Sequence, residues 1–507
     1  MDILIGFQTL FSNPSVLFFI FMGAFVGIVV GALPGLTASA AIAMLVPVTF
    51  YLDPLSALAF LYVIGKAGRF GGSIAAILFN TPGTASSAAT MQDGYPMTLQ
   101  GKSGKALKIS TIASVFGDFS GELVLIFGAS FIAIYTERMG PPEYFAVYAM
   151  AFVVIGSVIG NSMIKGLLST LFGIICGLVG LDPITGDTRY DFGILELEGG
   201  LSLVPLLIGV FVITEVLAQA EQETQWSLAD KQVDKGIDPT SDYVTLQEIK
   251  TCLPVMSRST LVGAFVGLMP GLGSAVACFI AYAGEKGRSK HPERWGTGIV
   301  EGVAAPEASN NAVSGPSMIP LLTLGIPGST IAAILTGVFL IHGIIVGPTI
   351  FTESKELVFG LFAAGLIGIV LYGLMGYFGA PLIGRIIRQV PVRLIYPFVF
   401  LTAFIAAYSP STSTFEIIIM GIFGIIGYGM RRFNFSAPAF IIAFVLTKGA
   451  EEALRQSLIL SDSGAGIFLE RPVAIVFMVL GLLVLVGRAI TVVRKDRLTP
   501  ASEFIDE

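Results

Sequence analysis

Charged side chains are scarce in this chain of 507 residues: Asp, Glu, Lys and Arg supply 13% of it, where soluble domains carry about 25%. Apolar residues make up 54% of the sequence. Runs approaching or exceeding the roughly 18 apolar residues that a membrane-spanning helix needs recur, for example over 16–33, 109–134, 357–383 and 473–486. The composition therefore predicts an all-α polytopic protein with the lipid bilayer as its surroundings.

Cysteine and histidine are also rare, with three and two copies, and none shows the paired spacing of a metal site or a disulfide framework. No Gly-Lys-Ser or Gly-Lys-Thr phosphate loop follows the glycines of "GLMPGLGS". These absences argue against a zinc site, a disulfide framework and ATP-driven chemistry. No nucleic-acid partner is expected. The first apolar run also lacks the basic flank of a secretory signal, so we expect it to be retained.

Lysine and arginine gather in a few connections, including 102–108, 286–294 and 494–497. The positive-inside rule places these connections and the C-terminus in the cytoplasm. The longest polar stretch, 219–258, contains no motif and is expected to be a cytoplasmic linker. It would separate a first membrane half, 1–218, from a second, 259–450, with a further span and tail over 451–507.

A repeat relates these halves. "GIVVGALPGLTASAA" (27–41) matches "GAFVGLMPGLGSAVA" (263–277), and "PGT" at Pro82 matches "PGS" at Pro327. The charges that flank the copies predict opposite orientations. We therefore expect two inverted repeats with broken or re-entrant helices, one with its tip at 270–271, and about 11 to 12 membrane segments. Interrupted segments at equivalent places in inverted repeats are typical of secondary transporters.

The interruptions are the predicted substrate site, because proline and glycine leave backbone groups unpaired and a half-helix N-terminus attracts a carboxylate. A simple kink, or close packing of small residues, remains the alternative. The candidate substrate-binding residues are Pro34, Gly35, Thr37, Lys66, Arg69, Asn80, Thr81, Pro82, Gly83, Thr84, Gly271, Ser274, Pro327, Gly328 and Ser329.

Ionisable groups inside apolar segments are costly and point to function. Asp118 and Glu122 share one helical face and form either a proton or cation relay or a solvated pair at a helix end. Lys66 and Arg69 either attract the anionic substrate or pair with a carboxylate such as Asp93. Carboxylates and amides in or near the apolar segments are the candidate ion-coupling residues, and they could form a Na⁺ site. The set is Asn80, Glu301, Glu307, Asn310, Asn311, Asp118 and Glu122.

Several long motifs, among them "GALPGLTASAAIAMLVPVTF", "FGGSIAAILFNTPGTASSAATMQDGYPM" and "EGVAAPEASNNAVSGPSMIPLLTLGIPGS", resemble the large membrane subunit of the tripartite tricarboxylate transporters, the TctA family. The resemblance covers roughly 16–432. It implies a multi-pass permease of the bacterial inner membrane that works with a small TctB-like membrane subunit and a periplasmic TctC-like solute-binding protein. It also implies Na⁺ or H⁺ coupling and a carboxylate substrate such as citrate.

Lys66, Arg69 and Phe70 depart from the uncharged stretch expected before "GGS", and Asp118 and Glu122 are also unusual, which leaves the particular acid open. The leading hypothesis is ion-coupled import of a small di- or tricarboxylate by a non-enzymatic permease without a cofactor other than coupled Na⁺. A docking or receptor subunit is the main alternative, and an intramembrane enzyme is a further one. The oligomeric state, including a homo-oligomer, stays open.

Overall fold

The computed structural model describes residues 2–33, 36–136, 138–158, 162–182, 184–221, 243–347, 349–389, 392–462 and 464–498. Pro34 and Gly35, two predicted substrate-binding residues, lie outside this set, as does most of the predicted linker. The described part is almost entirely helical, and its strands are one short antiparallel pair, β1 (Gly180–Leu181) and β2 (Thr188–Arg189). This confirms the predicted all-α class.

Seven helices in the described part are long and apolar enough to cross a membrane, which supports a multi-pass protein. The larger number of segments expected from the sequence stays a prediction. The seven are α2 (Pro14–Ala32), α6 (Ser103–Thr136), the continuous stretch Leu203–Glu221 that joins α10 (Leu203–Leu207) to α11 (Thr214–Glu221), α12 (Leu246–Leu268), most of α18 (Lys355–Gln389), α20 (Thr414–Arg432) and most of α23 (Pro472–Leu498).

The chain forms two compact units, the first from 1–137 with 202–429 and the second from 138–201 with 430–507. Both predicted halves, 1–218 and 259–450, contribute to the first unit. The helix α12 starts at Leu246, inside the stretch predicted to be linker. The other helices of the first unit are α1 (Asp2–Ser12), α3 (Ala38–Leu45), α4 (Pro54–Phe79), α5 (Ser87–Leu99), α13 (Gly273–Arg288), α14 (Val300–Ala312), α15 (Ile319–Leu324), α16 (Thr330–Ile341), α17 (Ile350–Glu353) and α19 (Val392–Tyr408).

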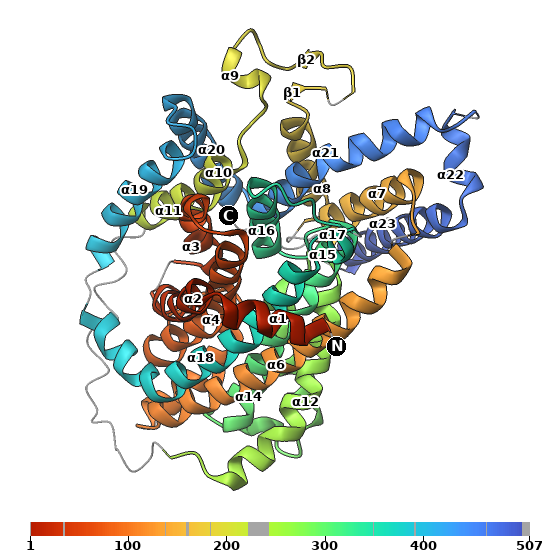
Figure 1. Cartoon of the computed structure of the whole chain (residues 1–507). Helices are drawn as coiled ribbons and strands as arrows, with labels where there is room; N and C mark the ends of the chain where they lie inside the picture. Colours follow the sequence, from red (N-terminus) through yellow and green to blue (C-terminus); the bar gives the residue numbers. More distant parts are fainter. Residues whose placement is uncertain are drawn as a thin grey trace, which may run out of the picture. The chain divides into compact units, whose positions relative to one another are not determined.

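Helix α4 lies in the interior of the first unit, where it packs against α2 and α18 (Figure 1). Almost every residue of α4 is buried, on all sides of the helix, as expected of a core helix rather than a surface helix. Glycines allow close approach here: a side chain at Gly31 of α2 would strike the Gly68 carbonyl of α4. On α6, Gly117 likewise contacts the Ala308 carbonyl of α14. The helices that carry polar side chains are thus held close together.

The predicted Pro-Gly interruptions are confirmed as helix breaks. Helix α4 ends at Phe79, its C-cap residue Asn80 adopts the left-handed conformation with φ of 54°, and α5 begins beyond Pro82-Gly83. Helix α15 ends at Leu324, its C-cap residue Gly325 has φ of 73°, and α16 begins beyond Pro327-Gly328. A third break separates α12 from α13, where the Gly271 amide donates to the Gly328 carbonyl at 3.1 Å. Two breaks of the second half are therefore in direct contact.

The second unit contains α7 (Pro141–Val158), α8 (Met163–Gly177), α9 (Leu195–Glu198), α21 (Ala437–Ile459), α22 (Ile467–Glu470) and α23. Its polar feature is the β1–β2 hairpin. Arg189 there donates to both oxygens of Glu451 at 2.6 and 2.9 Å, and Arg455 pairs with Asp182. Backbone amides of Thr185 and Ile184, together with these arginines, hold the pKa of Asp182 below its usual value.

Candidate functional site

Three helices of the first unit carry polar stripes in otherwise apolar surroundings. Members of each stripe are three or four residues apart, so they share one helical face. The stripes converge because α4, α6 and α14 pack against one another. They consist of Tyr62, Lys66, Arg69 and Ser73 on α4; Ser110, Ser114, Asp118 and Glu122 on α6; and Glu307, Asn310 and Asn311 on α14, continued by Ser314 beyond its end.

The first group, the lysine cluster, consists of Tyr62, Lys66, Asp118, Glu122 and Tyr372. The Lys66 Nζ lies 2.6 Å from Asp118 Oδ1 and 2.7 Å from Glu122 Oε2, and all three side chains are 0% exposed. Tyr62 donates to Glu122 at 2.8 Å, and Tyr372 of α18 donates to Asp118 at 3.0 Å. The ammonium balances one of the two buried negative charges and the two phenols donate hydrogen bonds, while Glu122 Oε1 has no partner among the described residues.

This arrangement decides two alternatives left open by the sequence. The two carboxylates do share a face, but they do not face water, so the solvated-pair interpretation is wrong. The partners of Lys66 are these two carboxylates rather than Asp93, the example named from the sequence. A direct contact of Lys66 with substrate stays untested, although its ammonium is already paired.

The second group, the glutamate cluster, surrounds the Glu307 carboxylate with hydroxyls. Ser73 of α4 donates to Glu307 Oε1 at 2.5 Å, Thr90 of α5 donates to the same oxygen, and Ser114 of α6 donates to Oε2 at 2.8 Å. Glu307 is fully buried, and no lysine or arginine pairs with it among the described residues. Since an isolated buried charge is very costly, this carboxylate needs a cation or a proton.

Polar atoms without partners lie on the same helix. Both side-chain polar atoms of Asn310 and the Oδ1 of Asn311 are buried and accept or donate no hydrogen bond to described residues. The other amide atom of Asn311 donates to the Glu307 carbonyl at 3.2 Å. Hard cations such as Ca²⁺ and Mg²⁺ prefer oxygen ligands, among them carboxylate and amide oxygens. Na⁺ is also a hard cation, so the same ligands suit it. The cluster can therefore hold a small cation.

A small cavity of about 10 Å³, here called the break pocket, lies between α4 and the break that separates α15 from α16. Arg69, Ser317 and Ser329 are among the residues that line it. Arg69 is 8% exposed and its Nε has no partner among the described residues. Its Nη1 donates to the Asn310 carbonyl at 3.4 Å. Ser329 caps α16 and accepts the Ala332 amide. A guanidinium and a helix N-terminus thus meet at one cavity, which suits a carboxylate.

Other predicted site residues lie apart from these groups. Thr37 caps α3, Asn80 is exposed at the end of α4, Thr81 donates to the Phe79 carbonyl, and Ser274 is half-buried near the start of α13. At the first break, the Gly83 amide donates to the Gly72 carbonyl at 3.4 Å, and Thr84 interacts with Ser87. The structure therefore does not place Asn80 in the glutamate cluster.

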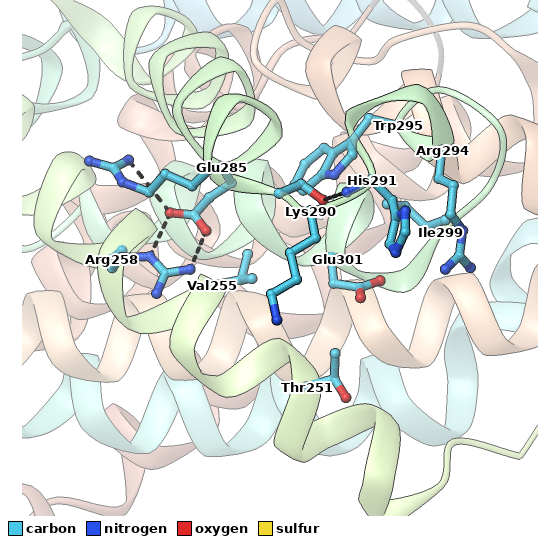
Figure 2. Close-up of a pocket in the computed structure, with 12 residues that line it drawn as sticks. Thr251, Val255, Arg258, Glu285, Lys290, His291, Arg294, Trp295, Ile299 and Glu301 are labelled. Atoms are coloured by element: carbon cyan, nitrogen blue, oxygen red, sulfur yellow. Dashed lines mark hydrogen bonds and ion pairs between the residues drawn. The ribbon is translucent and has the colours of Figure 1, made fainter.

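Glu301, predicted to couple ions, is also separate from Glu307. It lines a cavity of about 260 Å³, here called the basic pocket, formed by α12, the end of α13 and the connection to α14 (Figure 2). The two glutamates are six positions apart along α14, so they lie on different faces. The charged residues lining the basic pocket are Arg258, Glu285, Arg288, Lys290, Arg294 and Glu301, with His291 beside them.

The hydroxyl and phenol partners were missed by sequence reasoning: Ser73, Thr90, Ser114, Tyr62 and Tyr372. Periodicity carried a signal for most of them, because Tyr62 and Ser73 continue the Lys66–Arg69 stripe and Ser114 precedes Asp118 by four residues. Tyr372 offered no such signal, since it lies in the apolar α18 without a polar stripe around it.

The model of the tripartite tricarboxylate transporter TctA family matches residues 17–442. The chain belongs to the TctA family. An uncharacterized 52.8 kDa protein of the TAR-I ttuC′ 3′ region in Agrobacterium vitis is 34% identical to this chain over 97% of both chains. A second from the same organism, in the TAR-II ttuC′ 3′ region, is 35% identical over 46% of this chain and 97% of its own length. No solved structure matches.

Membership confirms the resemblance seen in the sequence and makes this chain a membrane component of a tripartite transporter. The lysine cluster, glutamate cluster and break pocket all lie within the matched residues. For a TctA protein they are therefore part of the family's own membrane region rather than of an added domain.

Proposed function

We propose that this TctA protein is the permease of an ion-coupled importer of small di- or tricarboxylates. The observation that carries the proposal is the convergence of an unpaired buried carboxylate, Glu307, with a buried guanidinium, Arg69, on the polar stripes of adjacent helices. One group requires a cation and the other attracts an anion. A site that takes both is what symport demands.

The break pocket is the proposed substrate site. Arg69 and the N-terminus of α16 would bind one carboxylate, and Ser317 and Ser329 would accept or donate further hydrogen bonds. At about 10 Å³ the cavity is closed to a carboxylate of any size. Substrate entry therefore requires α4 to move apart from the break between α15 and α16. The Pro-Gly breaks would act as the hinges of this motion.

Glu307 is the proposed site of the coupling Na⁺ or H⁺. Ser73, one of its hydroxyl partners, lies four residues after Arg69 and thus one turn along α4. Thr90, another partner, belongs to α5, which follows the first break. A cation bound here would fix α4 and α5 relative to α14, and so favour the arrangement that holds substrate. By linkage, substrate would raise cation affinity equally.

The remaining parts of the proposal follow from family membership and the repeat. The two halves would be inverted repeats in a bacterial inner membrane with a cytoplasmic C-terminus. A periplasmic TctC-like solute-binding protein would deliver the acid, and a TctB-like small subunit would complete the complex. Arg69 and Glu307 come from opposite halves, as expected for a site between repeats.

Uptake by the reconstituted complex tests this function. Labelled di- and tricarboxylates are presented to vesicles with and without the binding protein, under a Na⁺ gradient, a proton gradient or neither. Uptake that needs the binding protein and one gradient supports the proposal and identifies acid and ion. If the binding protein docks but no acid enters under any gradient, the chain is a docking subunit and the proposal is wrong.

A further inference from the structure

The basic pocket carries an excess of positive charge that the transport proposal does not use. Arg258 donates to both oxygens of Glu285 at 2.8 and 2.5 Å, and Arg288 lies 3.9 Å from the same carboxylate. Lys290 and Arg294 form no ion pair within the described residues. The lining contains four basic residues and two acidic ones, Glu285 and Glu301, and Glu285 is already engaged by Arg258, so the pocket is suited to a bound anion.

The pocket lies at one end of apolar helix surfaces. Its walls come from the first half of α12 and the last turn of α13, whereas exposed apolar side chains extend along the rest of both helices. Leu261 and Phe265 of α12 are 71% and 65% exposed, and Ile280 of α13 is 49% exposed. A ligand with an anionic head and apolar chains matches this pattern, as basic pockets beside membrane helices do elsewhere.

We propose that the basic pocket binds the phosphodiester headgroup of an anionic phospholipid. Lys290 and Arg294 would contact the phosphate, and the acyl chains would lie on the apolar surfaces of α12 and α13. The Arg258–Glu285 ion pair would stay intact and form the opposite wall (Figure 2). Inorganic phosphate offers the same oxygens but has no acyl chains. A phospholipid would therefore cover the apolar surfaces of α12 and α13, whereas inorganic phosphate would leave them exposed.

The pocket is connected to the glutamate cluster through Asp93 of α5. This carboxylate accepts the amides of Gly296, Gly298 and Ile299 at 2.9 to 3.1 Å, in the connection that follows Arg294. Asp93 lies three residues after Thr90, a partner of Glu307, so both are on one turn of α5. A lipid that orders the connection would therefore stabilise α5, and transport would depend on anionic lipid.

The test compares three full-length proteins in nanodiscs of phosphatidylcholine with or without phosphatidylglycerol. The test variant is Lys290→Ala/Arg294→Ala. The matched control is Lys250→Ala/Lys286→Ala, which removes two exposed lysines near the pocket but outside its lining. Phosphatidylglycerol retained after detergent extraction is measured by native mass spectrometry. The expected result is retention by wild type and control, and affinity roughly 30-fold weaker in the test variant.

Equal retention by all three proteins would overturn the proposal, because it would show non-specific attraction to the basic surface. A second measurement separates the sources of phosphate: thermal stability in phosphatidylcholine alone, with inorganic phosphate added. Stabilisation of wild type but not of the test variant by inorganic phosphate, without lipid retention, would assign the pocket to a soluble anion and overturn the lipid assignment. Phosphatidylglycerol-specific stabilisation lost in the test variant would support it.

Discussion

The lysine cluster and the glutamate cluster bury carboxylates in the same unit but stabilise them differently. Asp118 and Glu122 share the Lys66 ammonium and receive one phenol each, all in direct contact. Glu307 receives hydroxyl groups alone. The first arrangement draws one positive charge from the protein for its two carboxylates. The second contains no lysine or arginine partner among the described residues, so burial by itself does not distinguish an ion pair that supports the fold from the ion site proposed at Glu307.

The largest expected effect is at the glutamate cluster. Glu307→Gln keeps the shape and acceptor oxygen but removes the charge, so the cation loses its main ligand. We expect uptake driven by the coupling gradient to fall on the order of 100-fold or more, with the protein still folded. Initial rates in proteoliposomes measure this. Glu301→Gln, on the same helix but in the basic pocket, is the control and should leave gradient dependence intact.

At the lysine cluster we expect loss of stability. Lys66→Met leaves two buried carboxylates without their shared cation, which costs about 3–5 kcal/mol of unfolding free energy. Thermal or denaturant unfolding in detergent measures it. Neutralising the partners as well, in Lys66→Met/Asp118→Asn/Glu122→Gln, should restore most of the stability.

The same triple variant separates an ion pair from a proton relay. If it folds stably and still shows wild-type ion coupling, the lysine cluster supports the fold. A stable triple variant that has lost coupling would show that Asp118 or Glu122 carries the ion, and would reverse the roles assigned to the two clusters.

A smaller effect is expected at Arg69. Arg69→Lys retains the charge but loses the planar fork that matches a carboxylate. We expect KM for the acid to rise roughly 10- to 100-fold, with little change in the cation dependence. Uptake rates over a range of acid concentrations check this. An unchanged KM would remove the break pocket as the carboxylate site without affecting the assignment of Glu307.

The smallest effect concerns a carboxylate outside the membrane-spanning segments, Asp182 of the second unit. Its pKa is lowered in the folded state by backbone amides and arginines, so its stabilising contribution is present above the unfolded pKa of about 3.9. That contribution is lost as the pH falls through the folded value. Wild type should therefore lose slightly more stability than Asp182→Asn on acidification below about pH 4. Identical pH profiles would contradict this contribution.

Sequence alone predicted the helical class, the breaks and most of the ionisable residues of the two clusters. These features depend on local chemistry: hydropathy, the backbone limits of proline and glycine, and the cost of charge in apolar segments. It also placed Asp118 and Glu122 on one face, since that follows from their spacing.

Partners could not be predicted in the same way. Which carboxylate faces Lys66 depends on how α4 packs against α6, and Asp93 is instead directed to the connection before α14. Glu301 lines the basic pocket whereas Glu307 lies in the glutamate cluster, and the ion-coupling role predicted for both stays a prediction. The compact units likewise depend on contacts between segments distant in sequence.

Direct cation binding tests the central claim most closely. Equilibrium binding of labelled Na⁺ to the purified protein, with proton uptake followed in parallel, would be measured for wild type, Glu307→Gln and Glu301→Gln. We expect a cation or proton site in wild type and Glu301→Gln that strengthens when the transported acid is added and is missing from Glu307→Gln. Undiminished binding in Glu307→Gln would contradict it.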